Sequence, residues 1–396
     1  MSSSSRLKRD WSGLQEDLLI EISKHIHTRF ESIKFRSVCQ SWRSSAALPK
    51  PPFKPIILPR PIVTGYGSKY SRPHLCKLVE STIYTIRPKD QNQAHPPKCW
   101  IIKVEEDTPN VIHLMDPLSR NFMSPKPKTF PKGLNVLDFN IYGICKEYLL
   151  VSVKDSLTQK GYQSKGIYLR TMILGIQKVV VSSVASNNDF VIMALRSLNL
   201  IFIRPGNETW TNFDIAGETG CISDIVHYMG KFVVVCNSGR GFLIDPCTLS
   251  VTLLVDRAGY GGTKRLVESN GHLFLVEIFS NVSPWRHGTG GQFLPIVCEV
   301  FRLFEGKEQW VQVDSLADSV FLVCPECSFS VSAFDFPGCK GNCILLKDYN
   351  FVTLDKDDAF DRNIGVFNLI DGTFEAADSS YLQLFWPPPT WISAPK

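Results

Sequence analysis

Residues 222–255 read ISDIVHYMGKFVVVCNSGRGFLIDPCTLSVTLLV, and this stretch decides the fold. It contains four short runs rich in β-branched and aromatic residues, which predict strands at 222–229, 232–236, 242–245 and 251–255. Short turns that contain Gly or Pro separate the runs. Four consecutive strands joined by tight turns form an antiparallel meander, which is the unit of a β-propeller blade.

A weak repeat extends this pattern along the chain. An apolar strand that ends in a charged residue and a turn recurs around Asp116, Arg204, Asp245, Glu305 and Asp371. Arg204 and Asp245 stand 41 residues apart, a spacing typical of one blade. The longer gap after Asp116 leaves room for a blade with strands near 148–153 and 166–169. This count favours six blades, with five to seven possible, while the irregular spacing also fits a pair of β-sandwiches.

The segment 11–48 has helical periodicity instead. Two apolar helical stripes are predicted, the first at Leu18, Leu19, Ile22 and Ile26 and the second at Phe35, Val38, Cys39 and Trp42. Ser12 followed by Gln15 predicts a capping box at the start of the first helix. A bundle of under ~40 residues rarely buries enough surface to be stable alone, so this segment is expected to need a partner.

The order of these residues resembles an F-box, the small helical module by which substrate receptors dock on the Skp-type adaptor of cullin-RING ubiquitin ligases. The run FR-x-VC-x-x-WR at 35–43 is its most specific part, and Leu14-Gln15 stands where F-boxes commonly have Leu-Pro. The resemblance implies that the adaptor-binding residues are Leu14, Leu18, Leu19, Ile22, Ile26, Phe35, Val38, Cys39 and Trp42. An ordinary helical hairpin packed on the larger domain is the alternative.

Three runs near the C-terminus carry a second resemblance. They are FSVSAFDFPGCKGNCILL (329–346), IGVFNLIDGTFE (364–375) and WPPPTWI (386–392). These runs are similar to a plant domain of unknown function that commonly follows an F-box. The resemblance implies a propeller-like substrate-binding domain behind the helical module.

The predicted fold is therefore mainly β, with a small N-terminal α-helical F-box followed by an antiparallel β-propeller-like domain. The expected division is a disordered N-terminus at 1–10, the F-box at 11–48, a Pro-rich linker at 49–61 and the propeller-like domain at 62–396. The linker is expected because the six Pro residues of 49–61 lack backbone donors and favour extended, semi-rigid structure. A Pro-rich peptide ligand for another domain is the alternative.

Composition narrows the function classes. Hydrophobic residues make up 44% of the chain and charged residues 20%, which is ordinary globular composition. No apolar run approaches the ~18 residues of a membrane span, and the polar start MSSSSRLKRD is not a secretory signal. We therefore expect an intracellular soluble protein of the nucleus or cytoplasm, with no membrane partner. Residues 1–60 hold 11 Lys and Arg against 5 Asp and Glu, while the rest has no basic excess, so no nucleic-acid partner is expected.

The chemistry-bearing residues give little sign of catalysis or metal binding. Without a signal peptide, the twelve cysteines are predicted to be reduced thiols. Cys324, Cys327, Cys339 and Cys343 have a spacing that a zinc site could use, but the strand predicted between the two pairs holds them apart. The motifs G-x-S-x-G and H-E-x-x-H and the P-loop are missing. The expectation is a non-catalytic protein with no metal and no cofactor.

The sequence thus predicts the substrate-recognition subunit of an SCF-type ubiquitin ligase. Its expected partners are a Skp-type adaptor, through it the cullin-RING ligase, and an unknown protein target. Trp285 and Arg286, in a Gly-rich loop, are the residues expected to contact the target. The alternatives are a non-proteolytic propeller scaffold that uses the F-box only for assembly, and an enzyme built on a propeller.

Overall fold

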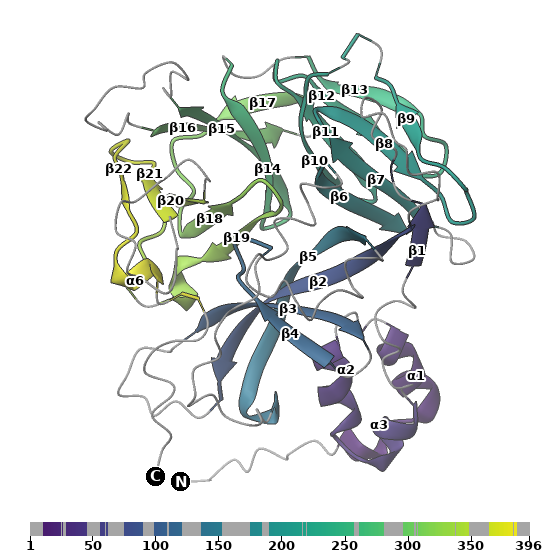
Figure 1. Ribbon diagram of the computed structural model, residues 1–396. Helices are drawn as coiled ribbons and strands as arrows, with labels where there is room; N and C mark the ends of the chain where they lie inside the picture. Colours follow the sequence, from purple (N-terminus) through teal and green to yellow (C-terminus); the bar gives the residue numbers. More distant parts are fainter. Residues whose placement is uncertain are drawn as a thin grey trace, which may run out of the picture.

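The computed structural model is a mainly β protein whose longer helices lie near the N-terminus (Figure 1). The structure describes residues 11–24, 26, 29–45, 56–59, 61, 75–89, 99–108, 111–120, 136–152, 175–183, 190–215, 217–218, 220–256, 261–280, 296–304, 306, 308–336, 338–347, 364–382 and 384–385. The helical module consists of η1 (Trp11–Gly13), α1 (Glu16–Lys24), α2 (Arg29–Arg36) and α3 (Gln40–Ser45).

The described strands after the helical module form five blades. Blade 1 consists of β2 (Leu75–Pro88), β3 (Trp100–Thr108), β4 (Val111–Met115) and β5 (Phe139–Ser152). Blade 2 consists of β6 (Ile176–Ser183), β7 (Phe190–Arg196), β8 (Asn199–Ile203) and β9 (Thr211–Phe213). The single pair Tyr148–Val179 joins β5 to β6 and links these strands into one sheet, and we divide the sheet into two blades at this pair.

The remaining blades follow in chain order. Blade 3 consists of β10 (Ile222–Tyr228), β11 (Lys231–Cys236), β12 (Gly241–Ile244) and β13 (Val251–Val255). Blade 4 consists of β14 (Thr263–Ser269), β15 (His272–Ser280), β16 (Ile296–Phe304) and β17 (Gln309–Gln312). Blade 5 consists of β18 (Ser319–Val323), β19 (Ser328–Ser332), β20 (Cys343–Lys347), β21 (Ile364–Asn368) and β22 (Phe374–Ala376). Two short helices, η3 (Ala333–Asp335) and α6 (Ser379–Leu382), flank its strands.

The blades are arranged in a ring around their innermost strands. Strands β5, β6, β10, β14 and β19 contact one another from blade to blade. Polar groups make several of these contacts: Lys178 Nζ of β6 lies 2.7 Å from Asp224 Oδ1 of β10, and the other Asp224 oxygen accepts from the backbone N–H of Leu266 in β14. Buried backbone and charged groups require such partners, and these contacts also fix the order of the blades.

Apolar clusters fill each junction between neighbouring blades. Separate clusters lie between blades 1 and 2, 2 and 3, 3 and 4, and 4 and 5. After Lys231, strand β11 is apolar, because the two neighbouring blades bury residues 232–236 on both faces of the strand. A strand that is buried on both faces has a continuous apolar sequence and not an alternating one.

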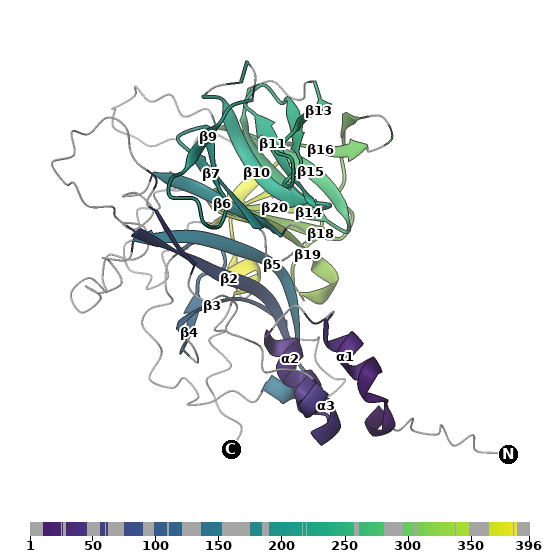
Figure 2. The ribbon, with the colours of Figure 1, turned by 90° about the vertical axis from the view of Figure 1, so that its right-hand side faces the viewer.

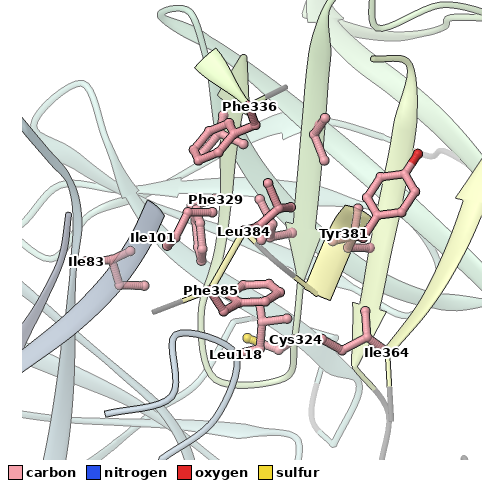
Figure 3. Close-up of a cluster of buried hydrophobic side chains, with 14 of the residues drawn as sticks. Ile83, Ile101, Leu118, Cys324, Phe329, Phe336, Ile364, Tyr381, Leu384 and Phe385 are labelled. Carbon is pink, nitrogen blue, oxygen red and sulfur yellow. The ribbon is translucent and has the colours of Figure 1, made fainter. Parts of the chain in front are cut away.

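A further cluster closes the ring between blade 5 and blade 1 (Figure 3). Ile83 and Ile101 of blade 1 lie in one cluster with Phe329 of β19, Phe336 and Phe385. The backbone N–H of Ile101 also donates to Leu384 O at 2.7 Å, so residues after blade 5 add to the outer part of blade 1. A ring that closes on itself is a propeller and not a pair of sandwiches.

The structure confirms the predicted meander and changes the favoured blade number. Strands β10 to β13 match the four predicted runs and pair antiparallel in sequence order. The described residues give five blades, one fewer than favoured and within the expected range. The strand expected near 148–153 is the end of β5, which pairs with β2 along its length and completes blade 1. The other strand of that expected blade, at 166–169, lies outside the described residues.

The recurring charged residue has a structural explanation. Asp245 follows β12, and its carboxylate accepts from the backbone N–H groups of Cys247 and Thr248. Asp371 follows β21 and accepts from the N–H of Thr373, while Asp116 follows β4 and accepts from the N–H of Leu118. Asp side chains stabilise turns by bonding their own backbone in this way, so the repeat marks turns at the ends of outer strands.

The Pro-rich segment contains a strand that the sequence did not predict. β1 (Ile56–Pro59) pairs antiparallel with the start of β2, and Leu58 is buried in the cluster between blades 1 and 2. Pro59 O also accepts a hydrogen bond from Trp210 Nε1 at 2.7 Å. The expectation of a linker over the whole of 49–61 is therefore wrong for 56–59, because three apolar residues outweigh the lack of a donor at Pro59, and Pro is tolerated at a sheet edge.

Candidate functional site

The helical module has a small internal core. Its members are Leu14, Leu19, Ile26, Phe35 and Trp42. Leu19 is completely buried, and the rings of Phe35 and Trp42 lie 4.6 Å apart. Trp42 Nε1 donates to Trp11 O at 3.0 Å and so ties α3 to the first turn of the module. These side chains hold the three helices together.

A second set of apolar side chains points away from this core. Leu18 is 51% exposed, Ile22 42% and Val38 51%, and Trp11 and Ile20 are exposed as well. Single exposed apolar residues are normal on protein surfaces, but Leu18 and Ile22 lie four residues apart on one face of α1, where two such side chains are neighbours. We call this set, Trp11, Leu18, Ile20, Ile22 and Val38, the exposed apolar set.

The predicted first stripe therefore divides between two faces of α1. Successive residues of a helix differ by about 100° in direction, so Leu18 and Leu19 cannot face the same way. Leu18 and Ile22, four residues apart, are exposed, whereas Leu19 and Ile26, seven apart, pack inward. The predicted second stripe divides likewise: Phe35 and Trp42 are core residues, Val38 is exposed and Cys39 is intermediate.

The helix boundaries also differ from the prediction. Residues 11–13 form the 3-10 turn η1 and α1 begins at Glu16, so Ser12 is not the cap of α1. The second stripe spans two helices, because α2 ends at Arg36 and α3 begins at Gln40. Arg36 and Arg43 bond each other's backbone carbonyls across this break, at 2.8 and 3.3 Å. The short connection is thereby held in one conformation.

The helical module packs directly on blade 1. Phe30 of α2 lies against Tyr84 of β2 in an edge-to-face arrangement, with ring centroids 4.9 Å apart. The cluster around this contact contains Tyr84, Ile86, Trp100, Ile102, Phe139 and Ile141. α2 also contacts η2 (Val136–Asp138), and the views in Figures 1 and 2 both place the three helices at the same ends of β2 and β5.

The other sequence-predicted sites have different outcomes. Trp285 and Arg286 lie outside the described residues. We call Cys324, Cys327, Cys339 and Cys343, near the C-terminus, the late thiols. Cys324 and Cys327 are buried at one end of β18 and β19, and Cys324 Sγ donates to Cys327 O. Cys343 Sγ donates to Lys340 O at 3.1 Å. Burial, and the nearby Glu326 carboxylate, raise the pKa of the Cys324 thiol far above its ordinary value, which favours the neutral form.

Sequence reasoning missed a mixed cluster at the junction of blades 2 and 3. Glu218, Cys221 and Cys236 bring one carboxylate and two thiols together, with their potential ligand atoms all within 4.8 Å of one another. No other group of this kind occurs among the residues that the structure describes. Glu218 and Cys221 lie three residues apart in one loop, whereas Cys236 lies in β11, so only the folded structure brings the three side chains together.

A compact helical module placed before a closed ring of blades is the arrangement of an F-box protein with a propeller domain, and the comparisons with known proteins show that the chain is of this class. The chain belongs to the KIB1-4 beta-propeller family, whose family model matches residues 75–368. The match begins with the first residue of β2 and ends with the last residue of β21.

Curated relatives resemble the whole chain, including the helical module. The chain is 31% identical to the F-box protein SKIP23 of Arabidopsis thaliana, over 97% of this chain and 96% of the relative. It is 29% identical to the F-box protein At2g17036 of the same plant, over 97% and 95%. The F-box/kelch-repeat protein At1g64840, also from Arabidopsis thaliana, is 26% identical over 85% and 84%. Among the described residues, no helix has the length and apolar character needed to cross a membrane.

Proposed function

We propose that the protein is a substrate receptor of an SCF-type ubiquitin ligase. Its helical module would dock on a Skp-type adaptor, and its propeller would bind the protein to be ubiquitinated. The observation that carries this proposal is the exposed apolar set, because it lies on a module that matches relatives named F-box proteins. Leu18, Ile22 and Val38 are the proposed docking residues, while the internal core supports them.

The protein's contribution in this role is placement and not chemistry. A bound target is held near the ubiquitin-carrying enzyme, which raises the effective concentration of its lysines. The contact between Phe30 and Tyr84 and the pairing of β1 with β2 favour one fixed orientation of the module on the propeller. A rigid connection raises this effective concentration more than a flexible linker of the same length.

The propeller's target-binding surface is proposed on its loops. Trp285 and Arg286 remain our candidates from the sequence, since aromatic and Arg side chains contribute most to many protein interfaces. The propeller holds such loops on a stable frame, and binding residues are often placed on loops of this kind.

The test of docking uses Leu18→Asp with Val38→Asp in the full-length chain. Each buried apolar side chain contributes ~1.5–3 kcal/mol, so losing both should weaken adaptor binding by more than about 100-fold. Ile370→Asp is the matched control, because Ile370 is equally apolar and exposed on a turn of blade 5. Co-purification with the adaptor is measured, together with thermal unfolding of each variant.

A folded double variant that still binds the adaptor as the wild type does would contradict the proposal. Leu19 is unsuitable for this test, since it is completely buried and a charge there would disrupt the module itself.

A further inference from the structure

The mixed cluster lies where the chain passes from blade 2 to blade 3. Glu218 and Cys221 belong to the loop between β9 and β10, and Cys236 is the last residue of β11. The backbone N–H of Asn237 donates to Cys221 O at 2.7 Å, which fixes the loop beside the end of β11. Three side chains from two elements are therefore held around one point.

The two oxygens of Glu218 have different partners. Cys221 Sγ lies 3.0 Å from Oε2, whereas Arg240 Nη1 lies 2.5 Å from Oε1. Arg240 also contacts Asp256 at 3.3 Å, and its guanidinium lies over the ring of Phe242. Arg240 thus orients the carboxylate so that Oε2 faces the thiols.

The cluster is mostly buried but remains partly accessible to solvent, as a site for a bound ion should be. Cys236 and Glu218 are buried, while Cys221 and Arg240 are only partly so, which leaves a route from solvent. Burial, together with the hydrogen bond to Glu218, raises the pKa of the Cys221 thiol to about 11, and burial raises that of Cys236 as well.

We propose that Glu218, Cys221 and Cys236 form a binding site for a zinc-class divalent cation. A tetrahedral zinc with sulfur ligands at ~2.3 Å and oxygen at ~2.0 Å needs neighbouring ligand atoms roughly 3.4–3.8 Å apart. In the cluster, Cys221 Sγ lies 3.0 Å from Glu218 Oε2, and all three potential ligand atoms lie within 4.8 Å of one another. Two thiolates and a carboxylate are ligands that zinc accepts, and the fourth position is open to water.

Charge and proton balance support this site. Zinc displaces one proton from each thiol, and the Glu218 carboxylate supplies the third anionic ligand. The divalent ion with three anionic ligands has a net charge of about −1. Arg240 supplies the compensating positive charge through the second oxygen of Glu218. The bound ion would join the loop before β10 to the end of β11.

The late thiols lack these features. Within the described part of the chain, Cys324, Cys327, Cys339 and Cys343 do not form a group of three converging ligand atoms. The candidate zinc site thus lies at the junction of blades 2 and 3, and not where the cysteine spacing suggested.

The test begins with reduced, metal-free, full-length protein titrated with Zn²⁺ against a chromophoric chelator. We expect one zinc per chain, and an apparent dissociation constant that falls about 100-fold for each unit of rising pH, because two thiol protons are released. Cys221→Ser and Glu218→Gln should each weaken binding by at least about tenfold. Cys247→Ser, at an exposed thiol of the same blade, and Cys339→Ser, among the late thiols, are the matched controls and should bind as the wild type does.

A second readout needs no variant. Bound zinc should protect Cys221, the partly exposed thiol of the cluster, from alkylation, as followed by peptide mass spectrometry, while Cys247 stays reactive. Failure of reduced protein to bind zinc, unchanged binding by Cys221→Ser, or equal alkylation of Cys221 with and without zinc would each overturn the proposal. A loss of binding in Cys339→Ser alone would assign the ion to the late thiols instead.

Discussion

Phe30 of α2 meets Tyr84 of β2 edge to face, with ring centroids 4.9 Å apart and ring planes at 83°. This pair joins the helical module to the propeller through a shared apolar cluster, so the two parts form one packed unit. The orientation of the module is therefore a property of the fold.

The first prediction concerns this pair. An edge-to-face aromatic pair contributes ~0.5–1.5 kcal/mol beyond its buried area, so Phe30→Ala and Tyr84→Ala should show a coupling energy of that size. The measurement is a double-mutant cycle from denaturant unfolding. In a reconstituted ligase, Phe30→Ala should slow target ubiquitination while adaptor binding is retained. Additive effects of the two substitutions would argue against the contact.

The second prediction tests which way α1 faces. Leu19→Ala should lower the free energy of unfolding of the module by ~2–5 kcal/mol, because Leu19 fills its core. Leu18→Ala should change it by less than ~0.5 kcal/mol, since that side chain is half exposed, yet should weaken adaptor binding. Unfolding and binding are measured on the same two variants. The reverse pattern would mean that α1 presents its other face.

The third prediction concerns β1. A fragment that begins at residue 62 lacks Leu58 and the carbonyl that Trp210 bonds, whereas one that begins at residue 50 keeps both. Losing a buried Leu and one hydrogen bond should destabilise the propeller by ~2–4 kcal/mol. Denaturant unfolding of the two fragments gives the difference. Equal stability would show that β1 adds nothing to the propeller.

The fourth prediction is a pH dependence at the ion pair between Lys264 and Glu277, which are both fully buried and 2.7 Å apart. Burial alone would raise the pKa of Glu277, but hydrogen bonds from Lys264, Gly261 and Gly262 outweigh it and hold this pKa below its ordinary value. A depressed carboxyl pKa stabilises the fold above the unfolded pKa of ~4.3, and the gain is lost as the pH falls through the folded pKa.

Glu277→Gln should therefore lower the free energy of unfolding by ~3–5 kcal/mol at neutral pH, with a difference from wild type that shrinks below pH ~4. The control is Glu375→Gln, at an exposed carboxylate of β22. Urea unfolding across the pH range is the measurement. A difference that stays constant with pH would show that Glu277 is not ionised in the folded protein.

Part of this fold follows from sequence patterns alone. Strands β10 to β13 were predictable because their apolar runs are short, their turns carry Gly and Pro, and each strand pairs with its neighbour in sequence. The repeat of charged turn residues was predictable for the same local reason. The F-box resemblance identified the residues of the helical module, but periodicity could not assign Leu18 to the surface and Leu19 to the core.

The remaining features depend on contacts between distant segments. Within blade 5, β18 pairs with β20 in a parallel arrangement, whereas the other strand pairs are antiparallel. No local sequence pattern predicts this parallel pair. Lys264 reads as a surface residue in the sequence and is buried because Glu277 lies opposite. The cluster of Glu218, Cys221 and Cys236 forms only when a loop meets the end of a strand. The secondary-structure propensity of a short segment contains no information on contacts between segments that are distant in the sequence.

The apolar cluster that closes the ring between blade 5 and blade 1 has a consequence for the synthesis of the protein. Ile101 acquires its neighbours Leu384 and Phe385 only after all of blades 2 to 5 have been made. During translation, the apolar face of blade 1 that includes Ile83 therefore stays uncovered on the ribosome until the late part of the chain emerges (Figure 3). A nascent chain that stopped before blade 5 would leave this face open, and it would be a substrate for chaperones.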